Sequence, residues 1–208
     1  MSMGQSSTIP REAVSGVAIG LMLMTLFTTM WACIANAGLG GKDYHLVLAA
    51  FIILALTFLV NGIRMFGKAK SFPAATSEQD VAERKKAGKW FGIIFGAEGL
   101  GIFIAVNIVI NIGHPELVIP VIALVVGLHF YPLAKVFKRK VDYYLATWAT
   151  LVAVLGIVFS LNKTLTEPGV FAFVGIGIAV ATSCYGLYMI FNGTRLTKSA
   201  IEKKKPDN

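Results

Sequence analysis

The chain has 208 residues, of which 56% are hydrophobic and only 14% are charged, and its mean hydropathy is +0.71. A soluble domain carries roughly 25% charged residues to solvate its surface, so this composition excludes an ordinary soluble domain and indicates a membrane protein. The net charge of +8 would also suit a nucleic-acid-binding protein. The positions of the charges therefore have to decide between the two.

Six stretches are long and apolar enough to cross a bilayer, since a spanning helix needs about 20 mostly apolar residues. They comprise residues 13–37, 45–66, 89–111, 117–135, 143–161 and 169–191. None shows the alternating pattern of a barrel strand. The sequence therefore predicts an all-α, polytopic integral membrane bundle of six transmembrane helices.

The basic residues are distributed unevenly among the connections between these spans. Of the 19 lysines and arginines, only Lys42 and Lys163 fall on one side of the predicted bundle. The positive-inside rule then predicts that both termini are cytoplasmic and that the protein is a multi-pass protein of the cell (plasma or inner) membrane. The same charge makes anionic lipid headgroups the expected partners, and nucleic-acid binding is not needed to explain it.

The first span has an alternative interpretation as a secretory signal peptide. Residues 35–37, Ala-Asn-Ala, resemble a small-residue cleavage site after an apolar run. However, the run from Ala13 to Ala35 is much longer than the apolar region of a typical signal peptide, which has about 7–15 residues. We therefore expect the first span to be retained.

The connections define one membrane domain over residues 1–197. Those that contain Lys42 and Lys163 are short, so consecutive helices should form three antiparallel hairpins. Residues 77–88 predict a cytoplasmic helical extension that runs into the third span, with Thr76 or Ser77 as its N-cap. Residues 198–208 predict a basic cytoplasmic tail without regular structure.

A short pattern recurs at the cytoplasmic ends of the even-numbered spans. Asn-Gly-x-Arg occurs at Asn61–Arg64 and again at Asn192–Arg195, and Lys135 holds the basic position at the end of the fourth span. Parallel internal repeats of this kind occur in transporter folds. Because Asn, Gly and basic residues are common at any cytoplasmic helix end, the simpler interpretation is that membrane helix ends resemble one another.

Two ionisable side chains lie well inside the predicted hydrocarbon. Glu98 is nine residues past Lys89 and His129 is six residues before Lys135, so the two lie about 13 Å and about 9 Å from the same inner face. They occupy consecutive antiparallel spans at comparable depth, which predicts that they meet. A carboxylate in lipid has to pair, face a wet cavity or stay protonated, and such groups are candidate functional sites. The alternative is a structural hydrogen bond between two helices.

Two further residues complete the candidate substrate or proton site. Pro132 follows His129 by three residues and frees the carbonyl of Leu128, and a kink there would expose backbone polar groups beside the imidazole. Asn107 is a polar side chain of the third span. A tolerated proline and ordinary hydrogen bonding between helices are the simpler alternatives.

The third span carries glycines at helical spacing, namely Gly88, Gly92 and Gly96, with Gly99 close to the same stripe. Small residues on one face allow another helix to approach closely, so we expect this face to be a packing surface. The glycines lie inside an apolar helix and not between a strand and a helix, which excludes a phosphate-binding loop.

The two cysteines, Cys33 and Cys184, lie within apolar runs, and the chain has no Cys-x-x-Cys pair and no cluster of His and Cys. We therefore expect buried thiols, no metal site and no cofactor.

The segment "GLHFYPLAKVF", followed by "VDYYLATWATL", resembles a family of small bacterial membrane proteins of unknown function. That family carries a Gly-x-His-Phe-x-Pro motif on one span and a Tyr-Tyr pair at the start of the next. The matching positions are Gly127, His129, Phe130, Pro132, Tyr143 and Tyr144. The resemblance covers roughly a fifth of the chain and implies a bacterial membrane protein in which His129 matters.

Two classes of function fit these observations. The first is a small-solute or ion transporter or channel, proton-linked through Glu98 and His129. The second is a membrane sensor, accessory subunit or scaffold, including a homo-oligomer, that packs through its glycine face. An embedded enzyme ranks third, because no nucleophile–base–orienter set and no metal-ligand motif is visible. Access of water to Glu98 or His129 would distinguish the first class from the second.

The distribution of basic residues makes a direct prediction about topology. Reporter fusions at Lys42 and Lys163 should report the outside of the cell, and fusions at Lys70, Lys140 and Asn208 should report the cytoplasm. A mature protein that begins near Gly38 would contradict the six-span interpretation.

Overall fold

A computed structural model describes residues 9–74 and 78–202, and within these residues the chain is all-helical. Six long helices are each apolar enough to cross a membrane, which confirms the predicted fold class. A single 3-10 turn, η1 (Pro115–Leu117), precedes the fourth helix. The six helices are α1 (Arg11–Leu39), α2 (Leu46–Ala69), α3 (Glu78–Asn111), α4 (Val118–Phe137), α5 (Lys140–Leu161) and α6 (Glu167–Glu202).

Several helices extend beyond the apolar stretches from which they were predicted. α3 begins at Glu78, so residues 78–88 belong to the same continuous helix as the third span. The proposed N-cap residues Thr76 and Ser77 lie outside the described residues. α6 continues to Glu202, so the prediction of an irregular chain from residue 198 is wrong for residues 198–202. Hydropathy falls where the lipid ends, whereas helical backbone hydrogen bonds continue into the polar segment that follows.

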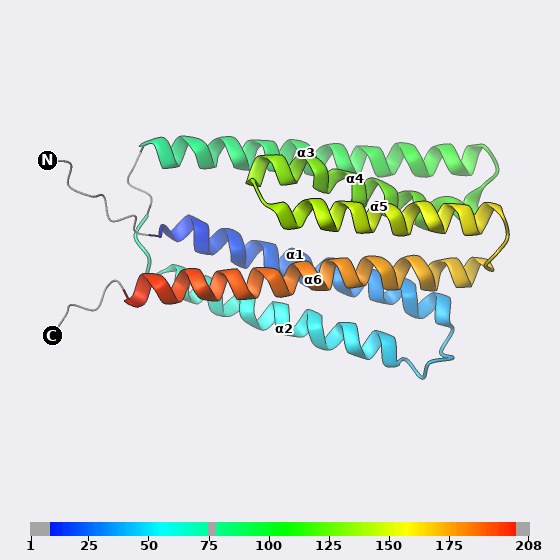
Figure 1. The fold of residues 1–208 in the computed structure, drawn as a ribbon, viewed down its shortest axis with the longest axis horizontal. Coiled ribbons are helices and arrows are strands. Elements are labelled where there is room, and N and C mark those ends of the chain that lie inside the picture. Colours follow the sequence, from blue (N-terminus) through cyan, green and yellow to red (C-terminus); the bar gives the residue numbers. More distant parts are fainter. Residues whose placement is uncertain (1–8, 75–77, 203–208) are drawn as a thin grey trace, which may run out of the picture.

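The helices are arranged around α1 and α6, which lie near opposite ends of the chain (Figure 1). α1 packs along α6 on one side and along α2 on the other, while α4 packs along α5. α1 begins and α6 ends at the same end of the bundle, and each helix runs opposite to the one before it (Figure 1). We call this end, which carries Arg11, Arg84, Arg139 and Arg195, the basic end.

α3 occupies an outer position, and its main neighbour among the long helices that the structure describes is α4. The residues that it buries are Ile94, Glu98 and Val109. Large apolar side chains such as Leu100 and Phe103 remain exposed on its other faces, as expected for a surface that contacts lipid. The outer position leaves α3 less firmly held than α1 or α6.

The α3 glycine stripe, which the sequence predicts to be a packing surface, has no helix packed closely against it among the described residues. A methyl group added at Gly88, Gly92, Gly96 or Gly99 would meet no atom within 4 Å in the described structure. α3 packs along α4 through a different face, which carries the buried residues Ile94, Glu98 and Val109. The space beside the glycines is open.

The close helix contacts are made by other glycines, and four of these lie on α6, namely Gly175, Gly177, Gly186 and Gly193. A methyl group added at Gly175 would lie 2.5 Å from the backbone nitrogen of Ala35 in α1, and one at Gly177 would lie 2.6 Å from a methyl of Val152 in α5. These glycines allow α6 to approach both neighbours closely, which is the main source of van der Waals attraction between helices in lipid.

The two cysteines are exposed, in contrast to the prediction that they are buried. The lipid is as apolar as the protein core, so an apolar run cannot show which of its residues face inward.

A matched pair of substitutions tests this assignment of the packing faces. Gly175→Ala should destabilise the bundle by about 1–3 kcal/mol, because the added methyl forces α1 and α6 apart. Gly92→Ala should leave stability unchanged or raise it by up to about 1 kcal/mol, because the site is open and alanine favours a helix. Melting temperatures in detergent measure both. A larger loss for Gly92→Ala than for Gly175→Ala would contradict the assignment.

Candidate functional site

Glu98 and His129 lie side by side in the interior of the bundle. Glu98 is on the α3 face that packs along α4, and it is 8% exposed. His129 is on α4, and its Nδ1 lies 3.4 Å from Oε1 of Glu98. Glu98 and His129 thus meet, as their equal depth on antiparallel helices predicts.

The ring of His129 is oriented by the backbone and not by Glu98. Its Nδ1 lies 2.5 Å from the carbonyl oxygen of Val126, one turn earlier in α4. A carbonyl oxygen only accepts, so Nδ1 carries the hydrogen and, in the neutral ring, Nε2 is left as an acceptor. Glu98 is thus within ion-pair distance of the imidazole without being its main hydrogen-bond partner.

The second carboxylate oxygen of Glu98 has no partner. Oε2 is buried and makes no hydrogen bond to any residue that the structure describes. An ionised carboxylate in apolar surroundings is costly unless it is paired, so this oxygen needs a proton, a solvent molecule or a cationic group. Glu98 is consequently the least satisfied of the acidic side chains that line the cavity described next.

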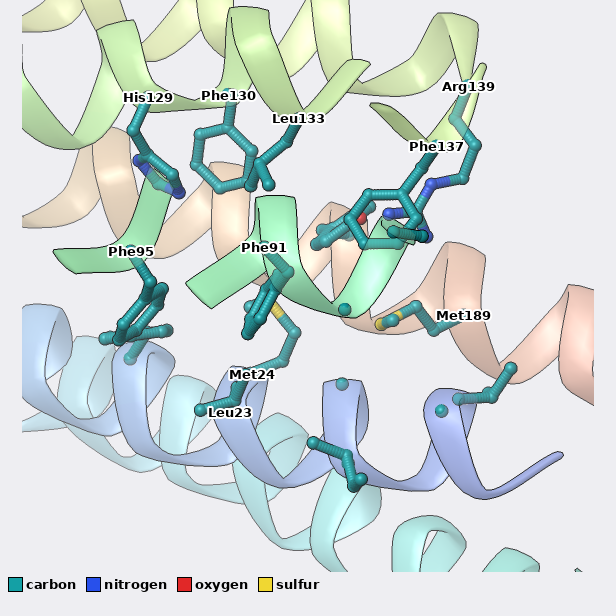
Figure 2. A pocket seen from close by; sticks show the side chains of 18 of the residues that line it. Leu23, Met24, Phe91, Phe95, His129, Phe130, Leu133, Phe137, Arg139 and Met189 are labelled. Atoms are coloured by element: carbon teal, nitrogen blue, oxygen red, sulfur yellow. The ribbon is translucent and has the colours of Figure 1, made fainter. Parts of the chain in front are cut away.

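The pair lines a cavity of about 600 Å³ that lies between α1, α3, α4 and α6. Figure 2 shows His129 and Phe130 directed into this space from α4, and Phe91 and Phe95 of α3 directed toward α1. Most of the lining is apolar. Aromatic rings come from Phe27, Trp31, Phe91, Phe95, Phe130, Phe137 and Tyr185.

The cavity runs from the basic end into the interior. Its lining includes Arg84 and Glu98 of the same helix, which are separated by about 21 Å along the helix axis. Glu12 of α1 also lines the cavity at the basic end and forms a 3.0 Å ion pair with Arg84. This pair and a contact between the rings of Phe27 and Phe95 join α1 to α3.

A second ion pair, between Arg139 and Asp142, lies where the cavity borders the start of α5. Nε of Arg139 donates to Oδ2 of Asp142 at 3.2 Å, and Asp142 is fully buried. The guanidinium carbon of Arg139 lies 4.6 Å from the ring centroid of Phe137 and 5.5 Å from that of Tyr185. These rings and the carboxylate occupy Arg139 on several sides.

The sequence analysis did not identify either ion pair. Arg139 and Asp142 are three residues apart at the start of a helix, which is a usable signal for a pair on one face. Glu12 and Arg84 are far apart in the sequence, and nothing in the sequence alone indicates that they meet. The aromatic lining was also not predicted, because phenylalanines are common throughout membrane helices.

Two of the predicted site residues, Pro132 and Asn107, do not line this cavity. Pro132 is exposed and does not line the cavity, and the imidazole contacts the carbonyl of Val126 instead of the freed carbonyl of Leu128. Asn107 is exposed, and its amide donates to the carbonyl of Phe103 in its own helix. An asparagine whose side-chain amide donates to a carbonyl of its own helix needs no hydrogen-bond partner on another helix.

The repeated Asn-Gly-x-Arg pattern also has a local explanation. Asn61 and Asn192 each donate to the carbonyl four residues earlier, both at 2.8 Å. Arg64, Lys135 and Arg195 are exposed near the basic end. Both copies of the pattern lie within continuous helices, since α2 ends at Ala69 and α6 at Glu202, and none of its members lines the cavity.

Within the segment that resembles the bacterial family, Gly127 has a packing role. A methyl group added there would lie 2.7 Å from the backbone nitrogen of Thr150 in α5. Phe130 is buried in the core and lines the cavity next to His129. Tyr143 and Tyr144 are exposed. The histidine and phenylalanine of the motif therefore line the cavity, the glycine packs against α5, and the tyrosines do not line the cavity.

Comparison of this chain with protein-family models, with curated proteins and with solved structures gives no match. The interpretation of the site therefore depends on its geometry.

Proposed function

We propose that the protein is a small-solute transporter, proton-linked through Glu98 and His129, with the cavity as its solute-binding site. The observation that carries this proposal is that a cavity of about 600 Å³ connects the buried pair to the basic end of the bundle. An accessory subunit has no need of such a cavity. A transporter requires its titrating groups to be reachable from water or from the solute.

The pair suits proton binding for a physical reason. A carboxylate in this apolar cavity is stabilised by taking up a proton, and the adjacent imidazole stabilises the ionised form when it is charged. The protonation state of Glu98 would then depend on what else occupies the cavity. This dependence is what couples a proton to a solute.

The position of α3 suits a conformational change. The contacts between α3 and α1 in the described residues include a partly exposed ion pair, Glu12–Arg84, and the ring contact between Phe27 and Phe95. An exposed ion pair contributes only about 0.2–1 kcal/mol, so separating the two helices at the basic end is inexpensive. Movement of α3 would change access to Glu98.

The proposed topology places the basic end, and with it both termini, in the cytoplasm of a cell with a plasma or inner membrane. The cavity would then open toward the cytoplasm, and the basic residues around it would lie among anionic lipid headgroups.

A second candidate function is an accessory subunit or homo-oligomer that packs through α3. The observation that favours it is the open space beside Gly92, Gly96 and Gly99, whereas Gly88 borders the cavity. A helix of another subunit could approach this face closely. This alternative does not require Glu98 to titrate.

Chemical modification of Glu98 tests the proposal. A hydrophobic carbodiimide reacts with a protonated carboxyl group, so dicyclohexylcarbodiimide should modify Glu98 in the detergent-solubilised protein, as located by mass spectrometry. The yield should fall as the pH rises, because the carboxylate form lacks the transferable proton. Asp142 provides an internal control, because it is fully buried beside Arg139 and should stay unmodified.

An unmodified Glu98 at every pH would contradict a titrating site and favour the accessory role. Modification that does not change with pH would contradict proton linkage.

A further inference from the structure

The cavity has features that select the chemical class of its solute. Its volume of about 600 Å³ falls within the range of about 300–1,000 Å³ that is typical of pockets for small organic molecules. The rings of Phe91, Phe95 and Phe130 line its middle part (Figure 2). An apolar or aromatic body would therefore be accommodated, whereas a strongly hydrated small ion would lose its water without replacement.

The charged side chains along the cavity differ in whether they already have a partner. Arg84 pairs with Glu12 at 3.0 Å, and Arg139 pairs with Asp142 at 3.2 Å. His129 gives its Nδ1 hydrogen to Val126. Among the cavity residues that the structure describes, both arginines thus already hold a carboxylate, and an anionic solute would find neither of them unoccupied.

Glu98, in contrast to these arginines, has a carboxylate oxygen without a hydrogen-bond partner among the described residues. Its Oε2 is more than nine-tenths buried along with the rest of the side chain, has no hydrogen-bond partner among the described residues, and belongs to a side chain that lines the cavity. Three other buried side-chain oxygens lack partners, on Asp142, Thr150 and Ser183, but none of these residues lines the cavity. Among the described residues, the one buried side-chain oxygen that lacks a partner and belongs to a cavity-lining side chain is therefore that of a carboxylate.

We infer that the solute is a lipophilic organic cation, which binds among the aromatic rings and replaces the proton of Glu98. This inference rests on the proposed function. The exchange is balanced in charge: the carboxylic acid releases one proton to water, and the resulting carboxylate is paired with the positive charge of the solute. The faces of the aromatic rings add a further attraction for a cation.

The other ionisable groups near the cavity constrain the pH dependence. His129 on α4 faces Glu98 directly, Tyr185 on α6 lines the same space, and Glu12, Arg84 and Arg139 lie toward the basic end. Of these, only His129 is within ion-pair distance of Glu98, so the proton that is released on binding comes from this pair.

Two ions of the same size and shape but opposite charge provide the test. Tetraphenylphosphonium should bind the full-length protein in detergent, as measured by isothermal titration calorimetry, and tetraphenylborate should bind at least about tenfold more weakly. In weak buffer, at a pH where carbodiimide modifies Glu98, binding of the phosphonium should release about one proton per ion. The bound ion should also protect Glu98 from the carbodiimide.

Matched substitutions assign these effects to one carboxyl group. Glu98→Gln keeps the shape of the side chain and should abolish proton release and weaken phosphonium binding by about tenfold or more. Glu116→Gln makes the same chemical change at the opposite end of the bundle, outside the cavity, where Glu116 pairs with His114. This control should leave both measurements unchanged.

Three results would overturn the inference. They are equal binding of the two ions, phosphonium binding without proton release, and absence of phosphonium binding. Each of them leaves the proposed function in place if carbodiimide still modifies Glu98 in a pH-dependent way. Failure of that modification would instead remove the proposed function. The comparison of the two ions uses the wild-type protein, so it remains decisive if Glu98→Gln fails to fold.

Discussion

The absence of water from the hydrocarbon core is the constraint on which the rest of this structure depends. Every polar group placed there has to find its partner within the protein. The backbone meets this requirement by forming six long helices. Side chains meet it locally or between helices: Asn61 donates to its own helix, Thr28 donates to Thr182, and the indole of Trp148 donates to the carbonyl of Gly177. Against this background, an acidic side chain that is buried and only partly satisfied is informative.

Glu98 combines three properties that do not occur together elsewhere in the described residues. It is buried, one of its oxygens lacks a partner, and it lines the cavity. Asp142 shares the first two, but its other oxygen is bonded to Arg139 and it lies away from the cavity. The two acidic side chains therefore have different roles. Asp142 fixes the start of α5 against a cation, whereas Glu98 is left to bind a proton or a cationic solute.

The bundle separates a firmly packed part from a more loosely held helix. α6 is joined to its neighbours by close approaches at Gly175 and Gly177. α3 has no such contact at Gly92, Gly96 or Gly99, and at Gly101 an added methyl would meet only a side-chain methyl of Val125 in α4, at 3.2 Å. The described contacts that join α3 to α1 include the Glu12–Arg84 ion pair and one pair of rings. The site lies at the boundary between these two parts. A solute that enters there would contact both of them, which is the arrangement needed if binding is to move one part relative to the other.

The sequence predicts the six helices well because a long apolar run has few alternatives in a bilayer. It also brings Glu98 and His129 together, because depth from a common surface is set by the helical rise. It fails for properties that depend on rotation about the helix axis. Apolar residues face both lipid and protein, so the sequence could not show that Cys33 is exposed or that Gly92 lies on the open face of α3. Contacts between distant segments, such as Glu12–Arg84, were equally inaccessible.

The most direct test of the central claim is infrared difference spectroscopy of the protein as the pH is raised. The account predicts a carbonyl band of a protonated carboxylic acid that disappears with rising pH and is absent from Glu98→Gln. A band that persists in Glu98→Gln, or a Glu98 carboxyl group that shows no change over the accessible pH range, would contradict the account.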